Sequence, residues 1–275
     1  MRLALVFAAC LALATPARAQ PVCGGDMPCA TPSGSYRIAL PEGDGPFPVV
    51  FFLHGYGGSA QGTMRGGTAR TALERGYAFI APEGLTRPGR NRTSWNFHPG
   101  FPGPRDEAAF LREVMQDAAA RFRIDPARSL LTGFSIGGSL TSYIACAHPG
   151  DFAAYAPVSG SFWRPHPENC AGPVRLLHTH GWRDQVVPLE GREIRAGFAQ
   201  GDVFEAMQIW RVANRCVRHY PDLFEIGDGF WRRVWLDCAA GSALELALFD
   251  GGHGVPRGWS GLALDWFEAQ IGLSQ

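Results

Sequence analysis

The stretch LLTGFSIGGSL, residues 130–140, decides how the rest of this sequence is interpreted. It contains a G-x-S-x-G pattern centred on Ser135, preceded by an apolar run and followed by the helix-like segment 136–148. In a tight turn between a buried strand and a helix, glycines flank a serine because a Cβ would collide with the neighbouring backbone. The stretch therefore predicts a nucleophile elbow that exposes the Ser135 hydroxyl, with an ordinary strand-to-helix turn as the alternative.

Strands and helices are expected to alternate along the chain. Apolar runs that predict strands lie at 35–40, 48–55, 77–82, 129–133, 174–181 and 244–253. Segments with helical spacing of apolar residues lie at 68–76, 106–124, 136–148 and 262–272, with Asp106 as a candidate N-cap. This alternation predicts an α/β fold with a mostly parallel central sheet and helices on both faces.

Four predicted strands end in a turn of glycine and polar residues. These turns are His54-Gly55, Gly133-Phe134-Ser135, His180-Gly181 and Gly252-His253. Because the carboxyl ends of parallel strands meet at the same edge of a sheet, we expect all four turns to lie together.

A serine hydroxyl is a poor nucleophile and needs an adjacent base. His253 is the best candidate, because it follows the last predicted strand and comes after an acidic residue in the expected Ser, Asp/Glu, His order. Asp184 is the preferred acid, since it lies in a loop a few residues past a strand end and would orient the imidazole. The competing acids are Asp202, which is expected to cap a helix, and Asp222, Glu225, Asp228, Asp237 and Asp250.

Two backbone N–H groups are candidates for binding a developing oxyanion. One belongs to Ile136, the residue after the serine, and the other to Tyr56 in LHGYGGSA, residues 53–60. The glycines of this segment permit an unusual backbone path, and an ordinary glycine turn is the alternative.

Trp95 and Trp182 are candidate substrate-binding residues, with burial in the core as an equal alternative. His178 and His180 lie on one face of a predicted strand and are candidate metal ligands. Because a third ligand is not evident, a structural role for His180 is favoured. The sequence has neither a phosphate loop nor a dinucleotide fingerprint, and no cofactor or metal is expected.

The first residues indicate export. Residues 1–19 have a basic start, an apolar run and Ala17-Arg18-Ala19, which predict a signal peptide and leave 20–275 as a single catalytic domain. Charge is balanced, with 25 basic and 25 acidic residues, and this argues against nucleic-acid binding. No other apolar run is long enough to span a bilayer, so no membrane anchor is expected. We expect the mature protein to be extracellular or periplasmic.

Six cysteines remain after Cys10 of the leader is set aside. An even number in an exported protein predicts three disulfides, for which the sequence alone allows 15 connectivities. Proximity along the chain favours Cys23–Cys29, Cys146–Cys170 and Cys216–Cys238.

Several motifs together resemble a known family. LHGYGGSA, SWNF, RDEAAFL, IDPARSLLTGFSIGG, HGWRDQVVP and GGHGVP occur in the order seen in secreted α/β-hydrolases named for polyhydroxybutyrate depolymerases and feruloyl esterases. The resemblance implies an α/β-hydrolase fold, with Ser135, Asp184 and His253 as a triad and Tyr56 and Ile136 as oxyanion donors. It also implies a disulfide near Cys216 and Cys238. One departure is Gly254-Val255-Pro256, where the family often has a tryptophan-proline pair after the histidine.

These features predict a secreted serine esterase that works through an acyl-enzyme. The expected substrates are feruloyl (hydroxycinnamoyl) esters of plant polysaccharide, or hydroxyalkanoate esters as oligomer or polymer. Two alternatives stay open, a catalytically inactive hydrolase-like binding protein and a peptidase or acyltransferase that uses the same triad.

Overall fold

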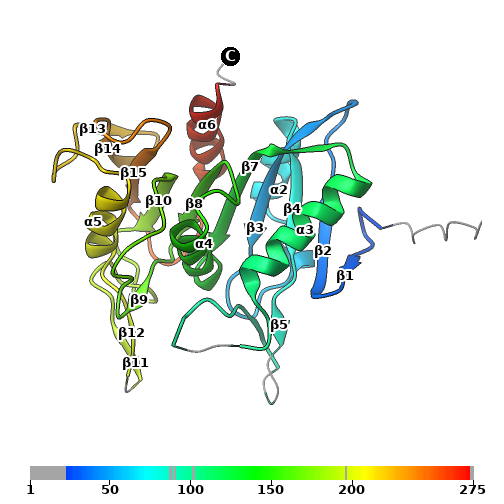
Figure 1. Ribbon diagram of the computed structural model, residues 1–275, viewed down its shortest axis with the longest axis horizontal. Coiled ribbons are helices and arrows are strands. Elements are labelled where there is room, and N and C mark those ends of the chain that lie inside the picture. Colours follow the sequence, from blue (N-terminus) through cyan, green and yellow to red (C-terminus); the bar gives the residue numbers. More distant parts are fainter. Residues whose placement is uncertain (1–22, 87–88, 90, 101–102, 196, 273–275) are drawn as a thin grey trace, which may run out of the picture.

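A ten-stranded sheet organises the computed structural model, which describes residues 23–86, 89, 91–100, 103–195 and 197–272 (Figure 1). The expected leader, residues 1–19, lies outside the described residues. The sheet order is β1-β2-β4-β3-β7-β8-β10-β15-β14-β13. In that order the strands are Cys29–Thr31, Gly34–Ala39, Ala78–Pro82, Phe47–Leu53, Ile124–Phe134, Ala154–Val158, Arg175–Gly181, Ala243–Phe249, Phe230–Trp235 and Leu223–Gly227.

The centre of the sheet is parallel and its two edges are antiparallel. Strands β4, β3, β7, β8, β10 and β15 run in one direction, as the alternating pattern predicts. Strands β1 and β2 complete one edge and β14 and β13 the other in antiparallel pairing. Strands β8, β13 and β14 are not among the strands predicted from the sequence.

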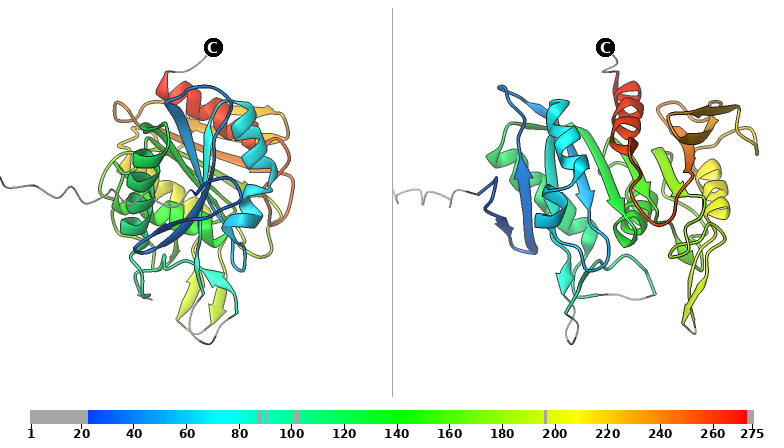
Figure 2. Two further views of the ribbon diagram at one scale, coloured as in Figure 1. Left: turned by 90° about the vertical axis from the view of Figure 1, so that its right-hand side faces the viewer. Right: turned by 180° about the vertical axis from the view of Figure 1, so that it is seen from behind.

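Helices cover both faces of the sheet (Figures 1 and 2). One apolar cluster joins the sheet to α3 (Glu107–Arg121), α4 (Ile136–Ala147) and α5 (Val203–Ala213). A second cluster joins the opposite face to α1 (Ala60–Met64), α2 (Gly67–Glu74) and α6 (Trp259–Ile271). The central strands are buried on both faces, which explains their continuous apolar sequences.

Two aspartates cap the first turn of a helix, as the sequence predicts. The Asp106 side chain accepts a hydrogen bond from the Ala109 amide at the start of α3. The Asp202 side chain accepts from the Phe204 and Glu205 amides at the start of α5, so it is occupied as a cap.

Two small β-structures lie outside the central sheet. One is the hairpin β5–β6 (Leu85–Thr86 and Thr93–Ser94), and the other is the sheet of β9 (Trp163–Arg164), β12 (Phe198–Gln200) and β11 (Glu193–Arg195). Both extend from the same end of the molecule, the lower end in Figures 1 and 2. This is also the end at which the parallel strands have their carboxyl termini.

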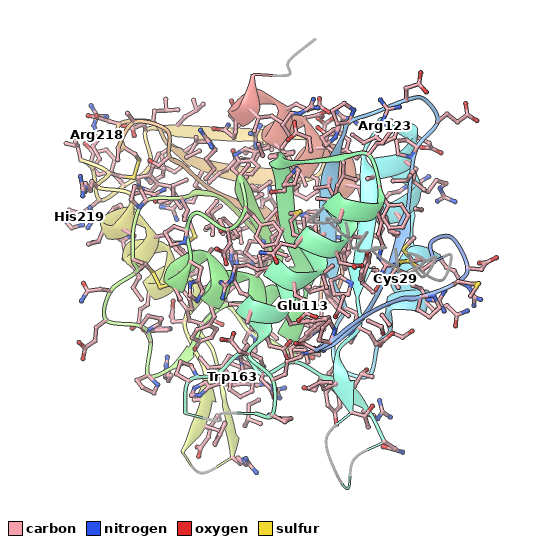
Figure 3. The ribbon with its side chains drawn as sticks, turned by 45° about the vertical axis from the view of Figure 1, so that its right-hand side comes forward. Cys29, Glu113, Arg123, Trp163, Arg218 and His219 are labelled. Atoms are coloured by element: carbon pink, nitrogen blue, oxygen red, sulfur yellow. A yellow bond between two sulfur atoms is a disulfide. The ribbon has the colours of Figure 1, made fainter. Side chains whose placement is uncertain are left out.

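Three disulfides join the pairs that proximity favours. Cys23–Cys29 ties the first described residue to β1, where its sulfurs are visible in Figure 3. Cys146–Cys170 joins the end of α4 to the segment before β10, and Cys216–Cys238 joins the segments after α5 and after β14. In the described part of the chain, no helix has both the length and the apolar composition needed to cross a bilayer.

Candidate active site

Ser135 occupies the turn between β7 and α4, as the G-x-S-x-G pattern predicts. Its φ of 58° and ψ of −123° lie in a region of backbone conformation that residues other than glycine rarely adopt. The turn is held on both sides, because the Ser135 amide donates to the Val158 carbonyl and its own carbonyl accepts from Ser139. The surrounding structure therefore maintains a backbone conformation that would otherwise be unfavourable.

The glycines around the turn are explained by close backbone approaches. A Cβ at Gly133 would lie 2.4 Å from the Gly137 carbonyl oxygen, and one at Gly137 would lie 2.2 Å from the Leu53 carbonyl oxygen. Gly160, after β8, is equally constrained, since its Cβ would lie 1.9 Å from the Ser135 carbonyl oxygen. These three positions allow β3, β7, β8 and α4 to meet directly at the serine.

The structure brings Ser135, His253 and Asp184 together in one hydrogen-bonded chain. His253 Nε2 lies 2.9 Å from Ser135 Oγ, and His253 Nδ1 lies 2.7 Å from Asp184 Oδ2. Because a carboxylate only accepts, the Nδ1–H donates to Asp184, which leaves Nε2 free to accept from the serine hydroxyl. The three side chains come from the loops after β7, β10 and β15, at the carboxyl edge of the sheet.

Asp184 is buried and fully hydrogen-bonded. Its Oδ1 accepts from the Val186 and Val187 amides at 2.8 Å each, and its Oδ2 accepts from His253. Burial by itself would raise the pKa of Asp184, but the hydrogen bonds from His253 and the Val187 amide outweigh it and lower the pKa below its ordinary value. The carboxylate is therefore ionised at neutral pH.

The loop that carries His253 is fixed from two sides. The Phe134 ring lies against the imidazole, with ring centroids 4.7 Å apart. Ser159, at the end of β8, donates from its hydroxyl to the Gly254 carbonyl at 3.0 Å. Sequence reasoning did not identify Ser159, since nothing local distinguishes it from other strand-end serines.

The two predicted oxyanion donors flank Ser135. Ile136 is the first residue of α4, whose amide end faces the turn. Gly55, next to Tyr56, is so close to the serine that a Cβ there would lie 3.4 Å from Ser135 Cβ. The backbone at Gly55 therefore passes close to the side chains of Phe134 and Ser135.

His54 and Trp95 hold this loop in place. The Gly84 amide donates to His54 Nε2 at 3.0 Å, so the His54 Nδ1–H is the proton that faces the Gly55 carbonyl at 2.9 Å. The Trp95 Nε1–H donates to the His54 carbonyl at 2.7 Å. His54 thus supports the loop that it begins, as its position at a strand end suggests.

A pocket of about 350 Å³ opens at Tyr56 and Ile136, between the two small β-structures, and Ser135 itself is not among its lining residues. It is lined by Tyr56, Arg92, Ser94, Trp95, Phe97, His98, Ile136, Trp163, Ile194, Arg195 and Phe198. Trp163 lies at the end of the molecule from which the hairpins extend (Figure 3). Burial lowers the pKa of His98, so this imidazole is neutral near pH 7.

The two candidate tryptophans have different positions. Trp95 reaches the pocket wall, but it is only 1% exposed and its indole nitrogen is used to hold His54. Trp182 does not line this pocket; it is 54% exposed and packs edge-on against Trp231 near the antiparallel edge of the sheet. Phe97, Trp163 and Phe198 were not predicted as pocket residues, although Trp163 follows closely on a strand end.

His178 and His180 form a buried pair behind Asp184. The His180 Nε2–H donates to the Val187 carbonyl at 2.7 Å, so the His178 Nε2–H donates to His180 Nδ1 at 3.1 Å. Burial lowers the pKa of both histidines. Within the described ranges, no three His, Cys, Asp or Glu side chains gather into a group that could bind a metal. The geometry therefore fits the structural role favoured for His180.

Comparisons with known proteins agree with this architecture. A family model described as "Putative esterase" matches residues 33–193, a range that contains Ser135 and Asp184. The chain belongs to this esterase family. The "Putative esterase NocK" of Nocardia uniformis subsp. tsuyamanensis is 33% identical over 159 residues, which span 56% of this chain and 44% of that protein.

Two further similarities extend over more of this esterase-family chain. The "Probable feruloyl esterase C" of Aspergillus niger is 25% identical over 237 residues, 81% of this chain and 77% of that protein. The solved structure of an acetyl xylan esterase from Aspergillus awamori has a TM-score of 0.64 at 16% identity, covering 87% of this chain and 94% of that one. The second similarity is one of fold, and it supports the predicted α/β-hydrolase architecture.

Proposed function

We propose that this protein hydrolyses carboxylic esters with Ser135 as nucleophile, His253 as general base and acid, and Asp184 as the residue that orients His253. Ser135 Oγ attacks the ester carbonyl while His253 Nε2 takes the hydroxyl proton. Nε2 then gives this proton to the departing alcohol, and an acyl-enzyme remains. A water molecule, activated by the same nitrogen, attacks the acyl-enzyme and releases the acid.

The observation that carries the proposal is the continuous chain from Ser135 Oγ through His253 to Asp184, with links of 2.9 and 2.7 Å. The hydrogen bonds to Asp184 keep it charged, so it stabilises the imidazolium that forms when the serine is deprotonated. The Asp184 carboxylate also fixes the tautomer that leaves Nε2 free to act as a base.

The proposed oxyanion site consists of the Ile136 and Tyr56 amides. Both are supported by their positions beside Ser135, one at the start of α4 and the other in the loop that His54 and Trp95 hold. Preorganised amides stabilise the tetrahedral intermediate because they need not reorient as charge develops, and one such donor contributes about 3 kcal/mol.

For the substrate, we propose feruloyl-type or hydroxyalkanoate esters, acted on outside the cytoplasm. The aromatic lining of the pocket suits a phenolic or short hydroxyacyl group. Relatives named as feruloyl esterases favour the first of these classes. The three disulfides and the expected leader support export, because disulfides persist in oxidising compartments.

A fluorophosphonate probe tests the proposed nucleophile. We expect one probe adduct on Ser135, located by mass spectrometry, and loss of esterase activity in proportion to labelling. Ser159→Ala is a matched control that should still be labelled. A folded wild-type protein that takes up no probe would contradict the proposal and favour the inactive binding protein.

A second experiment separates the two substrate classes. Methyl ferulate and a hydroxybutyrate trimer are compared by kcat/KM with the same preparation. Cleavage of either one identifies the preferred class, whereas cleavage of neither by a probe-reactive enzyme would remove both.

A further inference from the structure

A buried ion pair lies at the start of α3, outside the proposed catalytic residues. Arg105 is 8% exposed and Glu107 is 3% exposed, and both belong to the motif RDEAAFL, residues 105–111. Glu107 Oε2 accepts from Arg105 Nε at 2.9 Å and lies 2.8 Å from Arg105 Nη2. The helix begins toward the end of the molecule from which the two small β-structures extend (Figure 1). Neither residue of the pair lines the pocket at Tyr56 and Ile136.

Stability does not by itself account for this pair. Burial raises the pKa of Glu107 and lowers the pKa of Arg105, although each charge partly compensates for the burial of the other. Replacing a buried ion pair by apolar side chains of similar volume often leaves the stability of a protein unchanged or increases it. The hydrogen bonds that the pair makes to other segments therefore need a separate explanation.

One set of hydrogen bonds connects the pair to Trp95. Glu107 Oε1 accepts from the Asn96 amide at 3.0 Å, and the Asn96 side chain donates to the Arg105 carbonyl at 3.2 Å. Trp95 precedes Asn96 and donates from its indole nitrogen to the His54 carbonyl at 2.7 Å. The pair thus fixes the segment from which the indole reaches His54.

A second set of hydrogen bonds connects the pair to the residues after β4. Arg105 Nη2 donates to the Glu83 carbonyl at 3.1 Å. The Gly84 amide donates to His54 Nε2, and the Glu83 carboxylate accepts from the Ala60 amide, each at 3.0 Å. The loop between His54 and Ala60 is therefore held at both of its ends.

The two sets of contacts meet at His54, one at its carbonyl and the other at its imidazole. Tyr56, whose amide is a proposed oxyanion donor, follows two residues later in the same loop. Such a donor stabilises a developing charge only when it is held at hydrogen-bond distance from it. A displacement of about 1 Å, even one caused far from the reacting atoms, can lower a rate by about 10²-fold.

We infer that the Arg105–Glu107 pair positions the Tyr56 amide in the proposed oxyanion site. The two side chains are positioning residues that act through the contacts meeting at His54. This inference rests on the proposed ester hydrolysis and deepens it. Loss of the pair should weaken binding of tetrahedral, anionic species more than binding of the substrate, because only the former place full charge against the amide.

The variant Arg105→Met/Glu107→Met tests the inference, since it removes both charges together and leaves neither one buried without its partner. With p-nitrophenyl acetate, kcat should fall by at least about tenfold, which is part of the roughly 10²- to 10³-fold loss caused by removing a whole donor. KM should stay within about twofold, because the substrate carbonyl is not yet charged. The midpoint of the pH profile of kcat/KM should not move, because the contacts among Ser135, His253 and Asp184 are untouched.

Inhibition by phenyl trifluoromethyl ketone separates the oxyanion site from other causes of lost activity. Its adduct with Ser135 is tetrahedral and anionic, so its Ki should rise by a factor similar to the fall in kcat. Trp95→Phe removes only the indole N–H that reaches His54 and leaves the ion pair in place. It should change kcat and Ki in the same sense, and it tests the inference even if the double variant does not fold.

Arg232→Met/Glu245→Met is the matched control. Glu245 is 2% exposed and accepts two hydrogen bonds from Arg232 at the antiparallel edge of the sheet. This variant removes a buried ion pair of the same kind, so kcat, KM and Ki should equal those of the wild type.

The outcomes distinguish this inference from the proposed function. Unchanged kcat and Ki in the folded Arg105→Met/Glu107→Met variant, or in Trp95→Phe, would overturn the inference alone. A fall in kcat without a matching rise in Ki, or equal losses in the Arg232→Met/Glu245→Met control, would also overturn it, because the defect would then not lie in the oxyanion site. A wild type that hydrolyses no ester and is not inhibited by the ketone would contradict the proposed function itself, and the inference with it.

Discussion

Ser135 and Ser159 stand at the carboxyl ends of adjacent parallel strands, β7 and β8, and share an unusual backbone. Their φ angles are 58° and 51°. Each amide donates to the next strand of the sheet, Ser135 to the Val158 carbonyl and Ser159 to the Thr179 carbonyl. Their hydroxyls differ: that of Ser135 faces His253 Nε2, whereas that of Ser159 donates to the Gly254 carbonyl.

Backbone strain alone therefore does not distinguish Ser135, the proposed nucleophile, from Ser159. Both serines are strained and buried, yet only Ser135 is followed by a helix whose amide end can stabilise an anion. Ser159 holds the main chain of the loop from which His253 projects. In the proposed mechanism, Ser135 reacts with the substrate and Ser159 helps to position His253.

The largest expected effect comes from removing the Ser135 hydroxyl. Ser135→Ala should lower kcat/KM for a p-nitrophenyl ester by at least about 10⁴-fold, because catalysis without a nucleophile retains only the oxyanion site. The thermal midpoint should stay close to that of the wild type. If Ser135→Ala keeps most of its activity, the proposed contrast between the two serines is wrong.

Gly160→Ala tests whether the elbow depends on its close contact with β8. The new Cβ would lie 1.9 Å from the Ser135 carbonyl oxygen and 2.7 Å from the Ser139 amide nitrogen, so the elbow must move. We expect a loss of at least about 3 kcal/mol in the free energy of unfolding, as for other steric clashes with fixed backbone. Gly150→Ala has open space around its Cβ and is the matched control in the same denaturant titration.

Ser159→Ala should have a smaller effect, chiefly on kcat. It removes one buried hydrogen bond to the Gly254 carbonyl, worth about 1 kcal/mol, and loosens the His253 loop. A fall of about five- to tenfold in kcat with little change in KM is expected. Ser242→Ala, which removes a similar hydroxyl-to-carbonyl bond to Ala239, should leave kcat unchanged. Equal effects of the two variants on kcat would argue against a positioning role.

The last prediction concerns the pH dependence of stability and strand β10, which lies next to Ser159. Thr179, which accepts from the Ser159 amide, lies between His178 and His180, both buried with lowered pKa values. Their stabilising contribution is present above the unfolded pKa of about 6.5 and is lost as pH falls, because unfolding then takes up protons.

The slope of stability against pH measures this contribution. Below pH 6.5, each neutral buried histidine adds at most about 1.4 kcal/mol per pH unit to the slope of the unfolding free energy against pH. His178→Gln should therefore flatten the curve between pH 6.5 and 4.5 in urea unfolding experiments. An identical slope in wild type and variant would show that His178 takes up its proton equally in both states.

The parts of the fold and site that the sequence predicts are those encoded locally. The elbow around Ser135 is visible because glycine spacing and the strand-to-helix transition fall within a few residues. Five of the six parallel strands are visible because burial on both faces requires continuous apolar runs, whereas β8 was not predicted although it is equally buried. His253 follows from its place after the last of these strands, and the structure puts it 2.9 Å from Ser135 Oγ.

The parts that the sequence does not predict depend on contacts between distant segments. The role of Ser159 depends on its hydrogen bond to the Gly254 carbonyl, 95 residues away in sequence. The role of Trp95 depends on its hydrogen bond to the main chain of His54. Strands β13 and β14 escape prediction because they form an exposed antiparallel edge without a continuous apolar run. Trp182, a candidate for either the substrate cleft or the core, is 54% exposed, and its ring packs against Trp231.

The hairpin β5–β6 and the β9–β12–β11 sheet flank the pocket without contributing a strand to the central sheet. Loops of this kind tolerate changes in length and sequence that buried strands do not. Ligand preference can therefore be changed through these two appendages without a change at Ser135, Asp184 or His253. Transplanting them between homologues is accordingly a rational route to new specificities on this scaffold.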